Sequence, residues 1–377
     1  MMFAPSRFDA EEILDGLLRW VRIESPTIAP DAVNRMMDVA AADLAGLGAR
    51  IERIAGQPGY GDVVKAHLDG QSEGPGILVL AHLDTVHPLG TIEGKLRIRR
   101  EGDRAYGPGI MDMKGGTWAA LVALREVRRQ MGRTPLPVTF MLIPDEEVGS
   151  PSSRALIEEE ALRHKLVLVP EPTHGTSCVT GRHAILRFWV TTHGRPAHAG
   201  TPSPEGKSAI RVMARLIEEI EAGSRPERGI TYRVGIVGGG IFVNVIAIEC
   251  RAQVLCVAPD EAAFAEIRQR MAGLEGERDG VRVEVTSGPV RPLFEASPGT
   301  MALYEKARGF AAQMDLELEH GQFGGGSDGN FTGAIGIPTL DGLGVVGAGL
   351  HTFGEHIIVS ELPRRTALLA SLLASLD

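Results

Sequence analysis

Three short, uninterrupted apolar runs in the first half of this 377-residue sequence constrain its fold more than any other feature. They are GILVLA at residues 76–81, VTFMLI at 138–143 and KLVLV at 165–169. Continuous apolar runs of this length are typical of strands that are buried on both faces, as in a parallel sheet. A helical pattern at about residues 113–130 separates the first two runs. The sequence therefore predicts an α/β fold with a mostly parallel sheet sandwiched by helices.

The pattern changes near residue 180 and changes back near residue 290. Between these positions the sequence predicts the order strand, helix, strand, strand, helix, strand, which is a compact βαββαβ module of the ferredoxin-like kind. Helical and α/β features return after this stretch, and the chain ends in a helical pattern. We therefore expect one domain formed by residues 1–179 and 291–377, interrupted by a second domain at residues 180–290.

Polar residues follow each of the three apolar runs directly. In an open parallel sheet the carboxyl ends of the strands line the crevice where ligands bind. We therefore expect the side chains after the three runs to share one edge of the sheet. A fourth contribution comes from the loop GPGIMD, which leads into the predicted helix. The residues concerned are His82, Asp84, Glu146, Glu147 and Glu171 after the runs, and Asp112 in the loop.

This edge of the sheet would bring up to five carboxylates together. Their mutual repulsion would keep several of them protonated unless cations compensate, and burying unpaired charge is costly. The only cation close to them in sequence is Lys114. Two divalent metal ions would supply the missing positive charge and suit a mixed histidine and carboxylate ligand set. Each motif alone has an ordinary explanation, such as a solvated glutamate pair or a turn residue, but their joint placement favours a metal site.

Composition and charge exclude several classes of partner. A net charge of −9 argues against nucleic acid, because binding phosphates needs a basic surface. No long apolar run is present, so no membrane span is expected, and the N-terminus lacks the apolar core of a signal peptide. The three cysteines, Cys178, Cys250 and Cys256, include no CxxC pair and fit a reducing compartment. We therefore expect a cytoplasmic protein.

Five motifs in this order resemble the signature of a known enzyme family. They are AHLDTVHP, YGPGIMDMKGG, PDEEVGS, PEPT and GLHTFGEHI, within residues 76–356. The sequence is similar to the dinuclear zinc exopeptidases that include glutamate carboxypeptidase, aminoacylase, acetylornithine deacetylase and succinyl-diaminopimelate desuccinylase. The ending HTFGEHI, followed by SELPRR, favours the branch that resembles glutamate carboxypeptidase.

The resemblance implies a ligand set for two divalent ions in each chain. Asp112 would bridge both ions, His82 and Glu171 would complete the shell of one, and Glu147 and His351 would complete the shell of the other. Zinc is the favoured metal, with manganese or cobalt as alternatives.

The same resemblance assigns two further acidic residues. Asp84 would orient the imidazole of His82, as ligating histidines usually require. Glu146 would be the general base, which takes a proton from the attacking water and passes it to the leaving amine. The remaining histidines, His87 among them, are interpreted as surface or structural residues.

The inserted domain would act as a lid and a dimerisation surface. The resemblance implies that His198 stabilises the oxyanion from the partner subunit of a homodimer and that Asn244 contacts the substrate. The loop containing Gly326 and Ser327 would bring its backbone close to the substrate. Arg291 would bind the terminal carboxylate of the substrate, although an ordinary surface arginine stays an alternative.

The resulting prediction is a metal-dependent hydrolase that cleaves an amide bond of a small peptide or N-acyl amino acid, in the manner of a carboxypeptidase. An N-acyl-amino-acid deacylase, a dipeptidase or another amide hydrolase of the same fold is the main alternative. An aminopeptidase acting on long chains and a non-catalytic binding protein are less favoured. Glutamate-specific members carry an arginine where Leu255 stands here, which argues against a strong preference for C-terminal glutamate.

Overall fold

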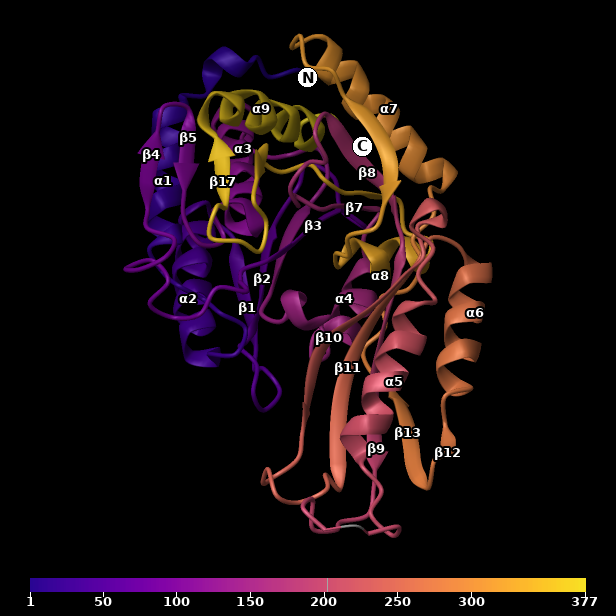
Figure 1. The fold of residues 1–377 in the computed structure, drawn as a ribbon. Helices are drawn as coiled ribbons and strands as arrows, with labels where there is room; N and C mark the ends of the chain where they lie inside the picture. Colours follow the sequence, from indigo (N-terminus) through magenta and orange to yellow (C-terminus); the bar gives the residue numbers. More distant parts are fainter. Residues whose placement is uncertain (202) are drawn as a thin grey trace. The chain divides into compact units, whose positions relative to one another are not determined.

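The three apolar runs form neighbouring strands of one six-stranded sheet in the computed structural model, which describes residues 1–201 and 203–377 (Figure 1). The strand order is β1-β2-β6-β3-β7-β15, and the strands from β6 to β15 pair in parallel. The two remaining pairings, of β2 with β6 and β1, are antiparallel. The bounds are β1 (Arg50–Ile54), β2 (Val63–Leu68), β3 (Ile77–His82), β6 (Val138–Ile143), β7 (Leu166–Leu168) and β15 (Thr339–Leu340).

Helices cover both faces of this sheet, which is why its central strands carry no polar alternation. Along β3, Ile77 and Val79 belong to one core cluster, whereas Leu78 and Leu80 belong to another. The first cluster includes residues of α1 (Ala10–Val21), α2 (Pro30–Gly46), α3 (Gly116–Met131), α7 (Pro298–Ala312) and α9 (Leu362–Leu373). The second includes residues of α4 (Arg154–Ala161) and α8 (Gly329–Ala334). The predicted α/β fold class is confirmed.

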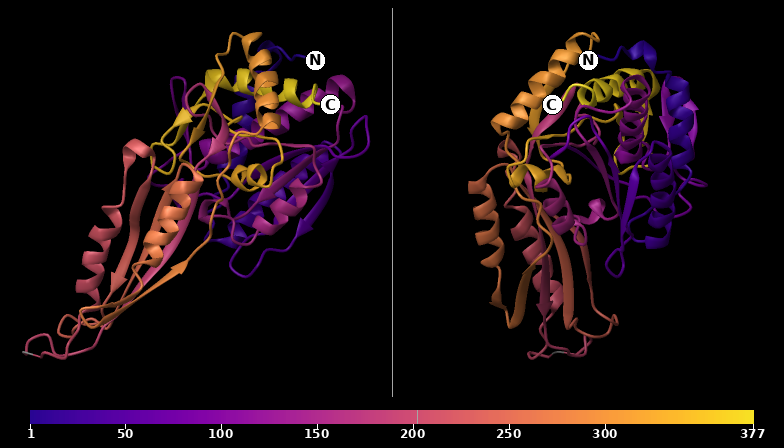
Figure 2. Two further views of the ribbon diagram at one scale, coloured as in Figure 1. Left: turned by 90° about the vertical axis from the view of Figure 1, so that its right-hand side faces the viewer. Right: turned by 180° about the vertical axis from the view of Figure 1, so that it is seen from behind.

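Two small sheets extend this part of the chain. One has the order β16-β17-β5-β4, with β4 (Arg99–Glu101), β5 (Arg104–Tyr106), β16 (Gly347–Ala348) and β17 (His356–Ile358). The other pairs β8 (Ser177–Arg182) with β14 (Glu319–Phe323). Both ends of the chain lie side by side near α9 (Figure 2), where the Met1 ammonium donates a hydrogen bond to Ser375 Oγ at 2.6 Å.

The chain divides into two compact units. Unit 1 consists of Met1–Gly181, Phe294–Phe323 and Ser327–Asp377, and unit 2 of Arg182–Leu293 and Gly324–Gly326. The catalytic and lid functions expected for residues 1–179, 180–290 and 291–377 stay predictions. Within the described residues, no helix has both the length and the apolar character needed to cross a membrane.

Unit 2 has the order of elements expected from the sequence. Its sheet runs β10-β11-β9-β13-β12, and every pairing is antiparallel. Alternate residues of β9, such as Leu186 and Val190, share a core with the apolar faces of α5 and α6. Both helices begin at side-chain caps, Ser208 and Asp260. The bounds are β9 (Ala184–His193), α5 (Ala209–Glu221), β10 (Thr231–Gly239), β11 (Glu249–Ala258), α6 (Glu261–Ala272), β12 (Gly276–Arg278) and β13 (Val281–Ser287).

Candidate metal centre

The parallel strands of unit 1 bring the predicted acidic residues and a histidine to one edge of the sheet. His82 is the last residue of β3, and Glu146 and Glu147 stand in a short 3₁₀ turn, Glu146–Val148, that follows β6. Glu171 follows β7. The carboxyl ends of parallel strands point the same way, so these residues converge although they are far apart in the sequence.

Asp112 lies at the middle of the cluster. Its Oδ1 is 3.1 Å from Nε2 of His82, and its Oδ2 is 3.2 Å from Nε2 of His351. The two oxygens of one carboxylate therefore face two different histidines. Each oxygen of Asp112 would thus be available to a different ion.

Each histidine has a second carboxylate beside it. Nε2 of His351 is 3.1 Å from Oε2 of Glu147, and Nε2 of His82 is 3.6 Å from Oε1 of Glu171. Ligand atoms about 2.0–2.2 Å from a zinc ion in tetrahedral geometry lie roughly 3.3–3.6 Å apart. The separations in the cluster are close to this range. His82, Asp112 and Glu147 each offer a ligand atom within 4.8 Å of the other two.

The electrostatics of the cluster show a shortage of positive charge. Burial and then repulsion from Asp112 raise the pKa of Glu147 to about 8 and hold the pKa of Glu171 well above its usual value. Burial opposes ionisation of Asp112, but hydrogen bonds from His351 and His82 outweigh it and lower the Asp112 pKa. Burial and repulsion thus favour the protonated forms of both carboxyl groups, and the donor set fits divalent cations that would replace those protons.

The histidines respond in the opposite direction. Hydrogen bonds to Asp112 and Glu147 raise the pKa of His351 to about 11. Burial would lower the pKa of His82, but its hydrogen bonds to Asp112 and Asp84 raise it well above the usual value. Both imidazoles therefore act as the local cations of the cluster and would lose their protons on binding a metal.

Asp84 supports the cluster from behind. Its carboxylate is fully buried and accepts hydrogen bonds from the backbone N–H groups of Glu146 at 3.1 Å and Glu147 at 3.2 Å. Thr27 Oγ1 donates to the same carboxylate at 2.6 Å. Nδ1 of His82 lies 3.0 Å from the backbone oxygen of Asp84, so Nδ1 would keep its proton in the neutral ring and leave Nε2, which faces Asp112, as the ligand atom. Asp84 thus positions both the imidazole and the turn with the predicted base.

Glu146 itself lies next to the cluster without taking the place of a ligand. Its Oε2 is 3.9 Å from Nε2 of His82, farther than the oxygens of Asp112 and Glu171. The side chain is buried at the edge of the sheet. This position suits a group that exchanges a proton with a water molecule bound at the cluster.

Glu355 and His87 are functional candidates that the sequence interpretation missed. Glu355 accepts hydrogen bonds from the backbone of Asp112 and from His87. Its position in the motif GLHTFGEHI, four residues after His351, was the available signal.

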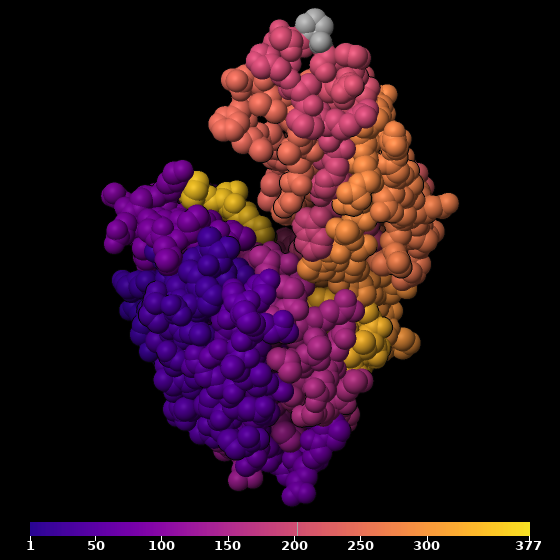
Figure 3. All heavy atoms as spheres, turned by 90° about the horizontal axis from the view of Figure 1, so that it is seen from below, coloured from indigo at the N-terminus to yellow at the C-terminus, as the bar shows by residue number. Residues whose placement is uncertain are grey.

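In unit 2 the structure brings His198 and Asn244 together. His198 forms an antiparallel bridge with Val245, and the backbone N–H of Ala199 donates a hydrogen bond to the backbone oxygen of Asn244 at 2.9 Å. Both side chains are exposed. The segments at residues 195–201 and 236–248 lie at one end of the unit (Figure 3).

The remaining predicted substrate residues differ in their surroundings. Arg291 is buried, so it is not the surface arginine of the alternative interpretation, and its backbone pairs with Ile185. Gly326 packs so closely on the Arg291 side chain that a Cβ there would lie 2.7 Å from Cδ of Arg291. Ser327 belongs to unit 1, where its buried hydroxyl donates to Asp341 Oδ2 at 2.5 Å. The Ser327 hydroxyl is thus bonded within unit 1, and the predicted substrate contact concerns the backbone of this loop.

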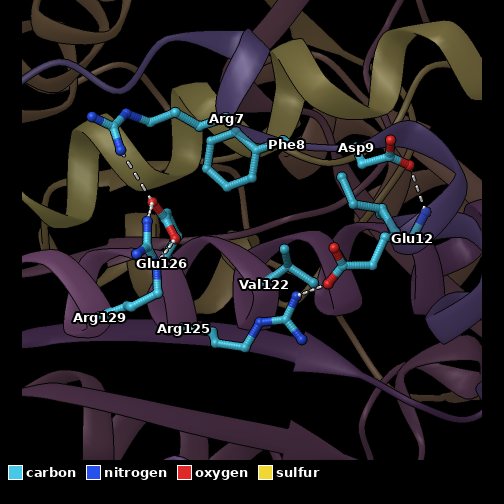
Figure 4. Close-up of a pocket in the computed structure, with 9 residues that line it drawn as sticks. Arg7, Phe8, Asp9, Glu12, Val122, Arg125, Glu126 and Arg129 are labelled. Carbon is cyan, nitrogen blue, oxygen red and sulfur yellow. Dashed lines mark hydrogen bonds and ion pairs between the residues drawn. The ribbon is translucent and has the colours of Figure 1, made fainter.

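A separate cavity of about 330 Å³ lies between α1 and α3 on unit 1 (Figure 4). Arg7 and Arg129 both contact Glu126, and Arg125 contacts Glu12. Each arginine of the cavity already pairs with a carboxylate, so the cavity presents no built site for an anion.

Known proteins resemble the chain over most of its length. The sequence pattern of Peptidase family M20/M25/M40 matches residues 78–375. Carboxypeptidase G2 of Pseudomonas sp. (strain RS-16) is 29% identical, over 100% of this chain and 92% of the relative. Succinyl-diaminopimelate desuccinylase of Novosphingobium aromaticivorans is 27% identical, over 90% and 92%. The crystal structure of an M20 family metallo-carboxypeptidase from Sulfolobus solfataricus matches with a TM-score of 0.76 at 14% identity, over 97% of this chain and 99% of that chain, which shows a shared fold.

Proposed function

Because the chain belongs to peptidase family M20/M25/M40 and is a metal-dependent hydrolase of C–N amide bonds, we propose that it cleaves small peptides or N-acyl amino acids in the manner of a carboxypeptidase. The observation that carries this proposal is the position of Asp112, whose two oxygens face two histidines with a further carboxylate beside each. His82, Asp112, Glu147, Glu171 and His351 would hold two divalent ions, and zinc is the favoured metal.

The residues around the ligands have distinct tasks in this proposal. Ions held by these five residues would lower the pKa of a bound water molecule and polarise the scissile carbonyl. Glu146 accepts the proton of the attacking water at its carboxylate and then gives it to the leaving amine. Asp84 keeps the His82 ring and the Glu146 turn in place through the hydrogen bonds described above. His198 supplies a donor to the oxyanion that forms at the scissile carbonyl.

Substrate recognition is assigned to unit 2 and the loop that joins it to unit 1. Arg291 would bind a free terminal carboxylate, because a guanidinium forms two parallel hydrogen bonds with it. Asn244 and the backbone at Gly326 and Ser327 would contact the rest of the substrate. The similarity to a succinyl-diaminopimelate desuccinylase supports the alternative substrate class, N-acyl amino acids.

We also propose that the protein is a homodimer formed through unit 2, and that His198 acts on the site of the partner subunit. Strand β10 is an edge strand of its sheet, and large apolar side chains near it are exposed, including Ile241, Phe242 and Val243. Exposed apolar side chains in a contiguous segment are typical of an interaction surface. A cytoplasmic location stays a proposal.

A hydrolysis screen tests the proposed function directly. Purified protein is loaded with zinc, manganese or cobalt and incubated with dipeptides and N-acyl amino acids, and the products are identified by mass spectrometry. We expect release of a C-terminal amino acid that depends on metal and stops when a chelator is added. Metal analysis that finds no ion bound after loading, or hydrolysis that a chelator leaves unchanged, would contradict the proposal.

A further inference from the structure

Glu355 is a buried carboxylate that bonds to the loop carrying Asp112. Only 1% of the residue is exposed. Its Oε1 accepts hydrogen bonds from the backbone N–H groups of Met111 at 2.8 Å and Asp112 at 3.1 Å. Its Oε2 accepts from the N–H of Gly109 at 3.1 Å and lies 2.7 Å from Nε2 of His87. Four donors therefore surround one side chain, which an ionised carboxylate can satisfy because it only accepts.

The loop needs such an acceptor because its backbone is irregular. Gly109 has a φ of 68°, in the left-handed region, and Asp112 has non-helical φ and ψ angles within the short helical turn Ile110–Gly115. Backbone N–H groups in such a segment lack regular carbonyl partners, and leaving them buried without an acceptor is costly. The Glu355 carboxylate takes the place of those carbonyls.

Glu355 also connects the three chain segments that supply histidine and bridging ligands. It stands four residues after His351, and His87 stands five residues after His82. The strand that follows Glu355, β17, pairs with β5, which leads into the Asp112 loop. A single carboxylate thus joins segments that are remote in sequence and that meet at the cluster.

We propose that Glu355, held by His87, is a positioning residue that sets the Asp112 carboxylate between His82 and His351. It acts through the three backbone N–H groups of the loop that donate to its carboxylate. The inference rests on the proposed function, because it assumes that Asp112 is the bridging ligand. Outer partners of this kind typically change metal affinity by about 10- to 100-fold when they are removed.

The test compares Glu355→Gln and Glu355→Ala with a matched control, Glu160→Gln. Glu160 is also buried in unit 1, with 3% exposed, and it bonds to Lys65 at 2.7 Å and His164 at 3.0 Å, away from the cluster. Zinc affinity is measured by competition with a chelator, and the stability of the metal-free protein by denaturant unfolding. We expect both Glu355 variants to lose about 10- to 100-fold in zinc affinity, and Glu160→Gln to lose stability alone.

Two results would overturn the inference. One is wild-type zinc affinity in Glu355→Ala, and the other is an equal loss of affinity in Glu160→Gln, which would reveal a general effect of destabilisation. If Glu355→Ala does not fold, the zinc affinities of Glu355→Gln and His87→Ala test the inference instead. His87→Ala keeps the three backbone contacts, so it should lose less zinc affinity than the glutamine variant. Equal zinc affinity in the wild-type protein, Glu355→Gln and His87→Ala would also overturn the inference.

A further variant, Asp112→Asn, separates this inference from the function on which it rests. If the wild-type protein binds no zinc, or Asp112→Asn binds it normally, the proposed metal centre is wrong. If Asp112→Asn loses zinc while the Glu355 variants keep it, the centre stands and only the positioning role of Glu355 fails.

Discussion

In unit 1 the candidate ligands contact one another, and their backbone donates hydrogen bonds to the carboxylates of Asp84 and Glu355, whereas in unit 2 the side chains of His198 and Asn244 are exposed. Buried strands position the unit 1 cluster, together with carboxylates that accept hydrogen bonds from backbone N–H groups. In unit 2, His198 pairs through its backbone with Val245, and its Nδ1 accepts a hydrogen bond from the N–H of Gly200 at 3.1 Å. Exposed apolar side chains stand next to it. From this difference we expect unit 1 to form the metal centre on folding, and unit 2 to supply side chains that contact the substrate.

The largest effect should follow from removing the base in unit 1. We expect Glu146→Gln to keep both metals. Its kcat should fall by about 10²–10⁴-fold, because the amide cannot take the proton of the attacking water. Steady-state kinetics checks the loss of kcat, and metal analysis of the same preparation checks that both ions stay bound. A glutamine variant with nearly wild-type kcat would show that another group is the base.

Loss of the His198 imidazole should have a slightly smaller effect and leave the centre in unit 1 intact. We expect His198→Ala to lower kcat by about 10²–10³-fold, which is typical when one oxyanion donor is removed, with unchanged zinc affinity.

Mixing the two inactive variants tests whether His198 acts on the partner subunit. A heterodimer of Glu146→Gln and His198→Ala would combine an intact Glu146 with a His198 from the other chain, so activity should reappear after subunit exchange. If His198 acts within its own chain, the mixture stays inactive. Analytical ultracentrifugation that shows an active monomer at the assay concentration would also contradict the trans role.

Arg291 tests whether the buried residues of unit 2 recognise the substrate. We expect Arg291→Ala to raise KM by about 10²-fold for substrates with a free C-terminal carboxylate, because a buried ion pair would lose one partner. Amidated analogues should be poor substrates of both proteins. Arg291→Lys serves as the control, since it keeps the charge and loses the bidentate geometry. An unchanged KM in the alanine variant would remove Arg291 from the binding site.

The charge shortage of unit 1 predicts that zinc affinity increases with pH. Glu147 must lose a proton to become a ligand, and its pKa is raised to about 8, while the protonated His351, with a pKa of about 11, must also deprotonate. Each displaced proton contributes about a tenfold change in affinity per pH unit below its pKa. Competition titrations from about pH 6 to about pH 8 should show a steep rise. A flat profile would mean that the cluster binds zinc without releasing protons.

The sequence was sufficient to predict the three central strands of unit 1 and most of its cluster, because both carry local signals. The uninterrupted apolar sequence of β6 predicts that the strand is buried, and Glu146 and Glu147 follow it within a few residues. The rule that parallel strands end at one edge then brings distant motifs together. The βαββαβ order of unit 2 was predictable for the same reason, since each element carries its own pattern.

Features that depend on pairing between distant segments could not be predicted. Asp112 and Glu355 are separated by 243 positions, and the donors to Glu355 are backbone groups that no residue type marks. The short strand β4 is fully exposed and has no apolar alternation, so the sheet that it forms with β5 and β17 gave no signal. The neighbours of Leu255 likewise emerged only from the strand register.

The smallest effect concerns the preference for one substrate over another. Leu255 on β11 lies in register between Arg187 on β9 and Arg233 on β10, and it is 37% exposed on that face of the unit 2 sheet. We expect Leu255→Arg to raise the ratio of kcat/KM for C-terminal glutamate over leucine by about fivefold, because a partly exposed ion pair contributes about 1 kcal/mol. Gln253→Arg, two residues earlier on the same face, is the matched control and should leave the ratio unchanged. A wild-type profile already dominated by glutamate would show that the neighbouring arginines suffice, and an equal response of both variants would mean that added charge alone changes the preference.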